Sequence, residues 1–404
     1  MIWLLGGYMW LFVHRPFEVW PVLGALQVER ASMAVVLTGW LLTGEFRWVR
    51  NPLNLAFVAF AIAIFLGWQE SGRPDLGEKP VSDWFKIALF YLIVVSTIRD
   101  ERDLKRLAIM YVATIAAYMA HSLWEYRNGR YQWTMGTVRL LGIDLTNGDP
   151  NTFAATILYS MPIALALWPQ AAKAWQHALL AGYAILSLAC ILLTSSRSAF
   201  VGVCFLGVVV ALASKHRLKL VLFMAVCAPF AWQALPLDRQ MRFLTLIDPS
   251  YGPENARESA EGRSKGFHDG LRLWVEHPVF GVGPGAFGVS TGTGFEAHHL
   301  YGQVLGELGT VGLVAFGWVV CAFISNALAA HRMGVQQPDL KGDFSFALVR
   351  ATSLTVVLLL LMGLGGHNLY RYTWLWFGAF QAVAMHQLRR REQELDARRQ
   401  NAKR

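Results

Sequence analysis

Long runs of apolar residues, separated by short polar stretches, dominate the sequence from end to end. A helix that crosses a bilayer needs about 20 mostly apolar residues, and about twelve segments approach that length. The predicted spans are residues 2–13, 31–45, 52–68, 84–98, 107–124, 153–168, 177–194, 198–214, 218–236, 300–325, 344–365 and 372–388. The first is short, which leaves open an extension through Val19 or an interfacial position. The pattern predicts an all-α polytopic membrane protein with one integral membrane domain over residues 1–404.

The amino-acid composition supports this interpretation. Hydrophobic residues make up 55% of the chain and charged residues only 16%, whereas soluble globular proteins carry about 25% charged residues. The low charged fraction excludes a disordered, fibrous or ordinary soluble protein. The four cysteines all lie inside apolar runs without the spacing of metal ligands, so neither a disulfide framework nor a zinc site is expected.

Positive charge predicts the orientation of the spans, because cytoplasmic loops carry an excess of Lys and Arg. The basic segment 389–404 contains seven of these residues and is predicted to be a cytoplasmic tail. Twelve spans then place the N-terminus on the same side, with 20 Lys and Arg inside and 15 outside. The net charge of +9 thus reflects topology rather than nucleic-acid binding. The arginines outside favour a negatively charged ligand on the outer face.

One outer segment, residues 237–298, is much longer than the others. A structureless loop of this length is uncommon and is usually functional. Part of it is predicted to be a helix, because apolar residues recur there with helical spacing. They are Phe267, Leu271, Trp274 and Val275. Pro278 ends the pattern, and the GVGPG segment that follows predicts a tight turn. We expect a short helix on the outer membrane surface that forms a lid or a cleft wall.

A histidine pair marks the end of this loop. His298 and His299 precede the span 300–325, and successive helical residues point about 100° apart, so both cannot face one cleft. The spacing predicts His298 on the same helical face as Gly302 and Gly309. A histidine at a membrane-surface cleft suits a general base, since its unperturbed pKa of about 6.5 lies near working pH. The alternative is a pair that only marks the water boundary.

Arg197 lies in the turn TSSRSAF between the spans 177–194 and 198–214, at the outer boundary of the membrane or slightly within it. A charged residue there is costly and is usually paired or functional. Its guanidinium group matches a phosphate in bidentate fashion. The alternative is a snorkelling arginine that anchors the end of a helix.

Two further arginines belong to the predicted loop helix. Arg263 precedes Phe267 by four residues and continues the apolar stripe, so it is predicted on the buried side, near a partner charge. The alternative is a surface ion pair with Glu258 or Glu261. Arg272 falls on the polar side of the helix, where a surface ion pair is the alternative to substrate binding.

Other polar residues are predicted to lie on the same outer face of the membrane. Arg139 and the segment GDPNTFA precede the sixth span, where the alternative role of Asp149 or Asn151 is to cap that helix. His367 and Arg371 lie in the short outer turn before the last span, which places them on the same face as the histidine pair. A plain polar turn is the alternative there.

Metal chemistry is not indicated by the sequence. No Asp-x-Asp pair lies on the predicted outer face, and no set of His and carboxylate residues has ligand spacing. The chain also lacks a Walker-type phosphate loop, which disfavours a nucleotide as the substrate that donates a group. We therefore expect no metal and no cofactor, with arginines as the phosphate ligands.

Together these segments resemble the O-antigen ligase and polymerase superfamily of bacterial envelope glycosyltransferases. The family's Thr-x-Ser-Arg-x-Ala pattern resembles residues 196–199, and its Asp-Pro-Asn-x-Phe-Ala pattern resembles residues 149–154. Its Gly-Arg…Trp…His-Pro-x-x-Gly-x-Gly pattern is similar to residues 262–283. Its His-Asn…Glu-x-Gly-x-x-Gly pattern is similar to residues 298–312. Four motifs in the right order, on one predicted membrane face, make a strong match over residues 139–312.

The resemblance implies a GT-C-like membrane fold in the bacterial inner membrane, with the active site facing the periplasm. The charge distribution places both termini in the cytoplasm. The resemblance also implies an undecaprenyl-diphosphate-linked O-antigen as donor. For the ligase branch it implies lipid A–core oligosaccharide as acceptor, in lipopolysaccharide biosynthesis. That branch resembles a metal-independent, inverting glycosyltransferase. This sequence departs from the family at His299, where the family usually has Asn.

The chemistry of the residues predicts roles that agree with the resemblance. The expected catalytic residues are His298, as the base, and Arg197 and Arg263, as a clamp on the diphosphate. The expected substrate-binding residues are Arg139, Arg272, His299, His367 and Arg371. The two substrates and membrane lipid are the expected partners.

Other activities compete with this prediction. Within the superfamily they are an O-antigen polymerase, which uses a second lipid-linked glycan as acceptor, and a protein O-oligosaccharyltransferase. Outside it, a transporter also commonly has about twelve spans, but transporters tend to show internal repeats and polar sites near the bilayer midplane. The polar clusters here gather on one outer face, which favours a glycosyltransferase.

Overall fold

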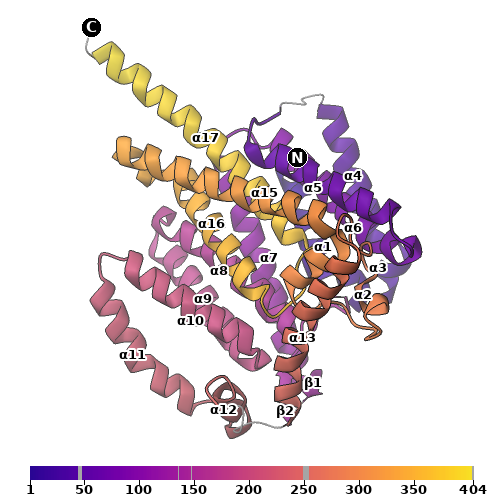
Figure 1. Cartoon of the computed structure of the whole chain (residues 1–404). Helices are drawn as coiled ribbons and strands as arrows, with labels where there is room; N and C mark the ends of the chain where they lie inside the picture. The colour runs from indigo at the N-terminus through magenta and orange to yellow at the C-terminus, as the bar shows by residue number, and fades with distance from the viewer. Residues whose placement is uncertain (44–47, 135, 147, 249–253, 403–404) are drawn as a thin grey trace.

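The computed structural model describes residues 1–43, 48–134, 136–146, 148–248 and 254–402, and most of them lie in helices (Figure 1). Every predicted span coincides with a helix. These helices are α1 (Ile2–His14), α4 (Val28–Thr43), α5 (Pro52–Gln69), α6 (Pro74–Thr97), α7 (Glu101–Arg127), α8 (Pro150–Leu167), α9 (Ala174–Thr194), α10 (Arg197–Ala213), α11 (Arg217–Gln233), α15 (Leu300–Gln336), α16 (Phe344–Met362) and α17 (Tyr372–Ala402). The prediction of an all-α polytopic membrane protein is confirmed.

The helices differ in how well they meet the requirements of a span. Among the described residues, seven helices are long and apolar enough to cross a membrane: α5, α6, α7, α8, α9, α15 and α16. Helices α1 and α10 are apolar but shorter. Helix α17 runs on through the basic segment 389–402, so the predicted tail is a helical extension that projects from the bundle (Figure 1). Its cytoplasmic position stays a prediction.

Several small elements on the connections were not predicted. Strands β1 (Tyr131–Thr134) and β2 (Thr137–Leu140) pair antiparallel, with Tyr131 opposite Leu140. The other short elements are α2 (Pro16–Val19), α3 (Pro21–Ala25), η1 (Trp168–Gln170) and η3 (Pro338–Gly342). Four-residue strands carry too little alternation to stand out in a sequence dominated by long apolar runs. Strand β2 carries Arg139, one of the predicted substrate-binding residues.

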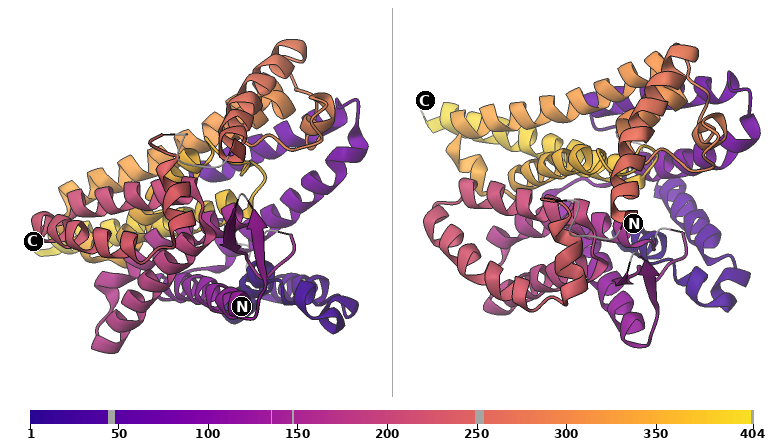
Figure 2. Two further views of the ribbon diagram at one scale, coloured as in Figure 1. Left: turned by 90° about the horizontal axis from the view of Figure 1, so that it is seen from below. Right: turned by 60° about the horizontal axis from the view of Figure 1, so that its bottom comes forward.

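The long outer segment folds into helices of its own. It contains α12 (Leu237–Leu244), α13 (Glu254–Glu276) and α14 (Phe287–Ser290). Helix α13 ends two residues before Pro278, as predicted, and packs along the start of α15 (Figures 1 and 2). Leu273, Phe287 and Ala297 form a small apolar cluster under this segment. The loop is therefore a folded cap on one end of the bundle.

Glycines bring α13 and α15 into backbone contact. A Cβ atom on Gly302 would lie 2.5 Å from the carbonyl oxygen of Gly266, and one on Gly270 would lie 2.3 Å from that of Gly302. The buried face of α13 thus runs through Gly266, Gly270 and Leu273. The predicted stripe was wrong in part, because Val275 is 75% exposed. Hydrophobic periodicity overlooks glycines, although small residues let helices approach most closely.

A break in α15 completes this end of the fold. Gly309 has φ 59° and ψ −153°, a conformation essentially restricted to glycine. Segment 278–283 fills the break: Gly283 donates its N–H to Glu307 O at 3.0 Å, and Thr310 donates to Pro278 O at 2.9 Å. Backbone groups in a membrane protein need such partners, since lipid supplies none. The GVGPG segment and the Glu-x-Gly-x-x-Gly segment are therefore two halves of one structural unit.

The glycine crossing predicts the effect of a single methyl group. Gly302→Ala should destabilise the protein by about 1–3 kcal/mol, because the new Cβ overlaps the α13 backbone. Gly317→Ala, on the same helix with open space around it, should be neutral or slightly stabilising. Thermal unfolding in detergent, followed by tryptophan fluorescence, measures both. A Gly302→Ala protein as stable as Gly317→Ala would contradict the crossing.

Candidate active site

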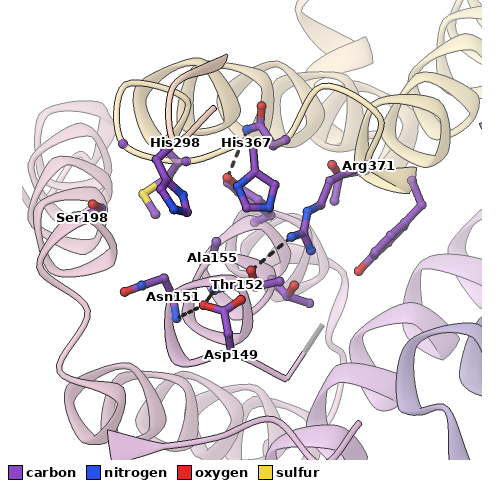
Figure 3. Close-up of a pocket in the computed structure, with 16 residues that line it drawn as sticks. Asp149, Asn151, Thr152, Ala155, Ser198, His298, His367 and Arg371 are labelled. Carbon is purple, nitrogen blue, oxygen red and sulfur yellow. Dashed lines mark hydrogen bonds between the residues drawn. The ribbon is translucent and has the colours of Figure 1, made fainter. Parts of the chain in front are cut away.

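A cavity of about 300 Å³ lies where the starts of α8, α10 and α17 meet the end of α16 and the segment before α15. Polar and apolar side chains line it, and Figure 3 shows histidines and an arginine pointing into it. The polar residues that matter here are Asp149, Asn151, Ser198, His298, His367 and Arg371. They come from segments far apart in the sequence that the topology brings to one face.

His298 reaches this cavity from the non-helical segment before α15 rather than from a helix. Helix α15 begins at Leu300, and the ring of its N-cap His299 accepts the N–H of Gly302 at 3.3 Å. The prediction that His298 shares a helical face with Gly302 and Gly309 was therefore wrong. The N–H of Leu300 donates to Gly363 O at 2.7 Å, which ties this segment to the end of α16.

Two histidines lie side by side in the cavity. The ring centroids of His298 and His367 are 5.5 Å apart (Figure 3). His367 Nε2 lies 3.0 Å from a carboxylate oxygen of Glu296, a residue that sequence reasoning did not single out. Burial lowers the pKa of His367, the charge of Glu296 opposes this, and Arg371 and His298 lower the pKa further. His367 is thus predominantly neutral near pH 7.

The start of α8 forms the opposite wall. Asp149 caps the helix by accepting the N–H groups of Asn151 and Thr152 at 3.0 and 3.2 Å, so the capping alternative holds for Asp149. Arg371 donates to Thr152 Oγ1 at 3.1 Å, and Arg139 donates to Asn151 Oδ1 at 2.8 Å. Both arginines are therefore bound to the segment that lines the cavity.

An arginine cluster adjoins this cavity at Ser198. Arg197 is 7% exposed and donates to Thr245 Oγ1 at 2.9 Å. Arg263 packs against Gly365, where an added Cβ would lie 3.3 Å from its Nε and 3.1 Å from Ser198 Oγ. Burial lowers the pKa of Arg263, and the positive charge of Arg197 lowers it further. The structure thus brings the two predicted clamp residues together from α10 and α13.

Arg139 and Arg242 extend the cluster. Burial lowers the pKa of Arg139 to about 9, with Arg242 as the next cause. Burial lowers the pKa of Arg242 to about 10, followed by the charges of Arg197 and Arg263. Guanidinium groups that lower one another's pKa gain from an anion placed among them. The arrangement therefore suits a ligand of more than one negative charge.

Part of the cluster also holds the turn that presents Arg197. Arg139 donates to Thr194 O at 2.7 Å and Arg242 to Ser195 O at 2.9 Å. Arg239, 4% exposed, donates to Val138 O and Tyr126 Oη at 2.9 and 2.8 Å. Cations at the carboxyl end of a helix such as α9 are favourable. Sequence reasoning missed Arg239 and Arg242, although their i, i+3 spacing in LDRQMRF was a usable signal.

Two predicted substrate-binding residues lie elsewhere. Arg272 is exposed and pairs with Asp269 and Glu276 on its own helix, at 3.6 and 3.4 Å. The His299 ring packs against Phe267, with centroids 4.9 Å apart, in addition to capping α15. In the described part of the chain, neither residue lines the cavity.

The remaining groups to place are carboxylates. The side chains of Glu258 and Glu261, the alternative ion-pair partners of Arg263, lie outside the described residues. Glu307 is fully buried and accepts a hydrogen bond from Tyr370 Oη at 2.7 Å. It therefore joins the α15 break to the turn that carries His367.

Comparison with known proteins shows which family part of this chain resembles. A family model described as O-antigen ligase matches residues 182–317, from the middle of α9 to just beyond the break in α15. The matched segment contains Arg197, Arg263 and His298. No curated protein matches the chain. The match supports a glycosyltransferase-type membrane enzyme of the ligase or polymerase kind. Residues 182–317 are thus similar to the O-antigen ligase family.

Proposed function

We propose that this protein is an O-antigen ligase of the bacterial inner membrane. It transfers a glycan from undecaprenyl diphosphate to lipid A–core oligosaccharide on the periplasmic face, with both termini in the cytoplasm. The observation that carries the proposal is the position of His298, in a cavity that adjoins a cluster of buried arginines at Ser198. One part suits a proton acceptor and the other suits a diphosphate.

The donor half of the reaction needs charge neutralisation. A sugar diphosphate already carries a good leaving group, so the enzyme has to stabilise the charge that develops on it. Arg197 and Arg263 supply this directly, since guanidinium groups bind phosphate oxygens in bidentate fashion. Arg139 and Arg242 add positive potential and hold the turn before Arg197. This electrostatic role requires no metal ion.

The acceptor half needs a base. The attacking sugar hydroxyl forms a bond to the anomeric carbon, the bond from that carbon to the diphosphate oxygen breaks, and the proton passes to His298. Undecaprenyl diphosphate leaves with the electron pair, and attack from the opposite face inverts the anomeric configuration. His367 and Arg371 line the same cavity and are proposed to contact the acceptor. The positions of Arg272 and His299 give them no such role.

A polymerase is the second candidate, because the family match does not separate the two activities. Both share the donor half, and only the acceptor differs. A lipopolysaccharide gel of a deletion strain separates them. Lipid A–core without O-antigen, with the glycan still on its polyprenyl carrier, is expected for a ligase. Core capped by a single repeat would identify a polymerase, and an unchanged ladder would contradict both.

Removal of the proposed base gives the first prediction from the proposed function. His298→Ala should abolish transfer, because the acceptor hydroxyl loses its proton acceptor. His268→Ala is the matched control, since this exposed histidine of α13 bonds only to Ser264 O of its own helix among the described residues. Transfer is measured with the purified proteins in vesicles, beside thermal unfolding. Near-normal transfer by a folded His298→Ala protein would remove it as the base.

The clamp gives the second prediction. Arg197→Lys keeps the positive charge but loses the planar fork, and the rate of transfer should fall about 10²–10³-fold, as for loss of one oriented donor to a developing anion. Arg73→Lys, at an exposed arginine paired with Asp75, should leave the rate unchanged. If Arg197→Lys proves silent, the residue is only a helix anchor.

Independence from metals gives the third prediction. Transfer by the purified protein in excess EDTA should equal transfer in buffer, because arginines carry the electrostatic role. Adding Mg²⁺ or Mn²⁺ back should not raise the rate. Loss of transfer in EDTA that a divalent ion restores would end this part of the proposal.

A further inference from the structure

Glu296 and His367 form a carboxylate–imidazole pair at the cavity. The carboxylate oxygen of Glu296 lies 3.0 Å from Nε2 of His367. The glutamate side chain is 63% exposed and the histidine side chain 30% exposed, so the carboxylate lies on the water side of the ring. Figure 3 shows the His367 ring beside His298, within the group of residues that line the cavity.

This pairing selects one form of the imidazole ring. A carboxylate accepts a hydrogen bond, so the neutral ring carries its proton on Nε2, and Nδ1 becomes an acceptor. In the described part of the chain, Nδ1 is buried and has no hydrogen-bond partner. A buried acceptor without a partner is costly unless a ligand or water satisfies it. The ring is therefore prepared to accept a hydrogen bond.

Burial keeps the ring neutral. Burial lowers the pKa of His367, and Arg371 and His298 act in the same direction, whereas Glu296 and Asp149 raise it. Since burial is the largest cause, the neutral form prevails near pH 7 and Nδ1 keeps its lone pair. A neutral His367 ring, whose centroid lies 5.5 Å from that of the proposed base, is suited to hydroxyl groups rather than to phosphate.

We propose that Glu296 holds His367 in its Nε2–H form, and that Nδ1 of His367 accepts a hydrogen bond from an acceptor-sugar hydroxyl adjacent to the one that His298 deprotonates. The inference rests on the proposed function and deepens it. It makes His367 a specificity-determining residue for a sugar with neighbouring hydroxyls. Glu296 is a positioning residue, because it acts through the ring and not on the sugar.

The kinetics of the two substrates test this assignment. Each variant is assayed in vesicles with an undecaprenyl-diphosphate-linked glycan as donor, against lipid A–core and, in parallel, against a second lipid-linked glycan as acceptor. Glu296→Gln should raise KM for the acceptor in use about tenfold, the loss expected for one hydrogen bond. KM for the donor should not change, because the arginine cluster is intact. A fold defect would instead lower kcat and leave both KM values alone.

A double-mutant cycle tests whether Glu296 acts through the ring. His367→Asn places an amide group near the position of Nδ1 that Glu296 does not orient. Adding Glu296→Gln in that background should have no further effect, whereas independent roles would give additive losses. Glu125→Gln is the matched control, since Glu125 lies 3.8 Å from His121 in a second Glu–His pair away from the cavity. It should behave as the unmodified protein.

The outcomes separate this inference from the proposed function. Suppose that His298→Ala loses transfer but that Glu296→Gln leaves KM for the acceptor unchanged. This result would overturn the inference and leave the proposed function standing. An equal rise in donor and acceptor KM would also overturn it. Full transfer by His298→Ala would instead remove the proposed base, whatever the Glu296 variant shows.

Discussion

The close approach of α13 to α15 is the constraint on which the site depends. Backbone contact at Gly266, Gly270 and Gly302 leaves no room for a side chain between the helices. It fixes the height and rotation of α13, and therefore the position of Arg263, one turn before Gly266. The same contact holds the segment that carries His298. One glycine crossing thus sets the distance between the proposed base and the proposed diphosphate clamp.

The second requirement is electrostatic. Bringing several guanidinium groups together in a largely buried place is costly, because each disfavours the charged form of its neighbours. Hydrogen bonds from Arg139 and Arg242 to the carboxyl end of α9 offset part of that cost. In the proposed reaction, the diphosphate of the donor offsets more of it, since it supplies negative charge among these arginines. The arginines that hold the turn after α9 and the proposed clamp residues therefore form one cluster.

The sequence predicted the helices well and the cap less well. Long apolar runs identify spans because lipid demands them, and the turn with Arg197 follows from two such runs meeting. The hairpin, the contacts of Arg239 and the pairing of Glu296 with His367 could not be predicted, since they depend on tertiary contacts between distant segments. The buried face of α13 was misplaced because glycines carry no hydrophobic signal. The sequence motif identified His298 correctly as a candidate, but it did not predict that this residue lies outside the helix.

Direct binding of the donor lipid tests the central claim, that the arginine cluster beside His298 holds a diphosphate. The dissociation constant of undecaprenyl diphosphate is measured for the unmodified protein, Arg263→Gln and His298→Ala in vesicles. The account predicts at least about tenfold weaker binding by Arg263→Gln, corresponding to about 1.4 kcal/mol, and unchanged binding by His298→Ala. Equal affinity of Arg263→Gln and the unmodified protein would contradict it, because the diphosphate would then bind elsewhere.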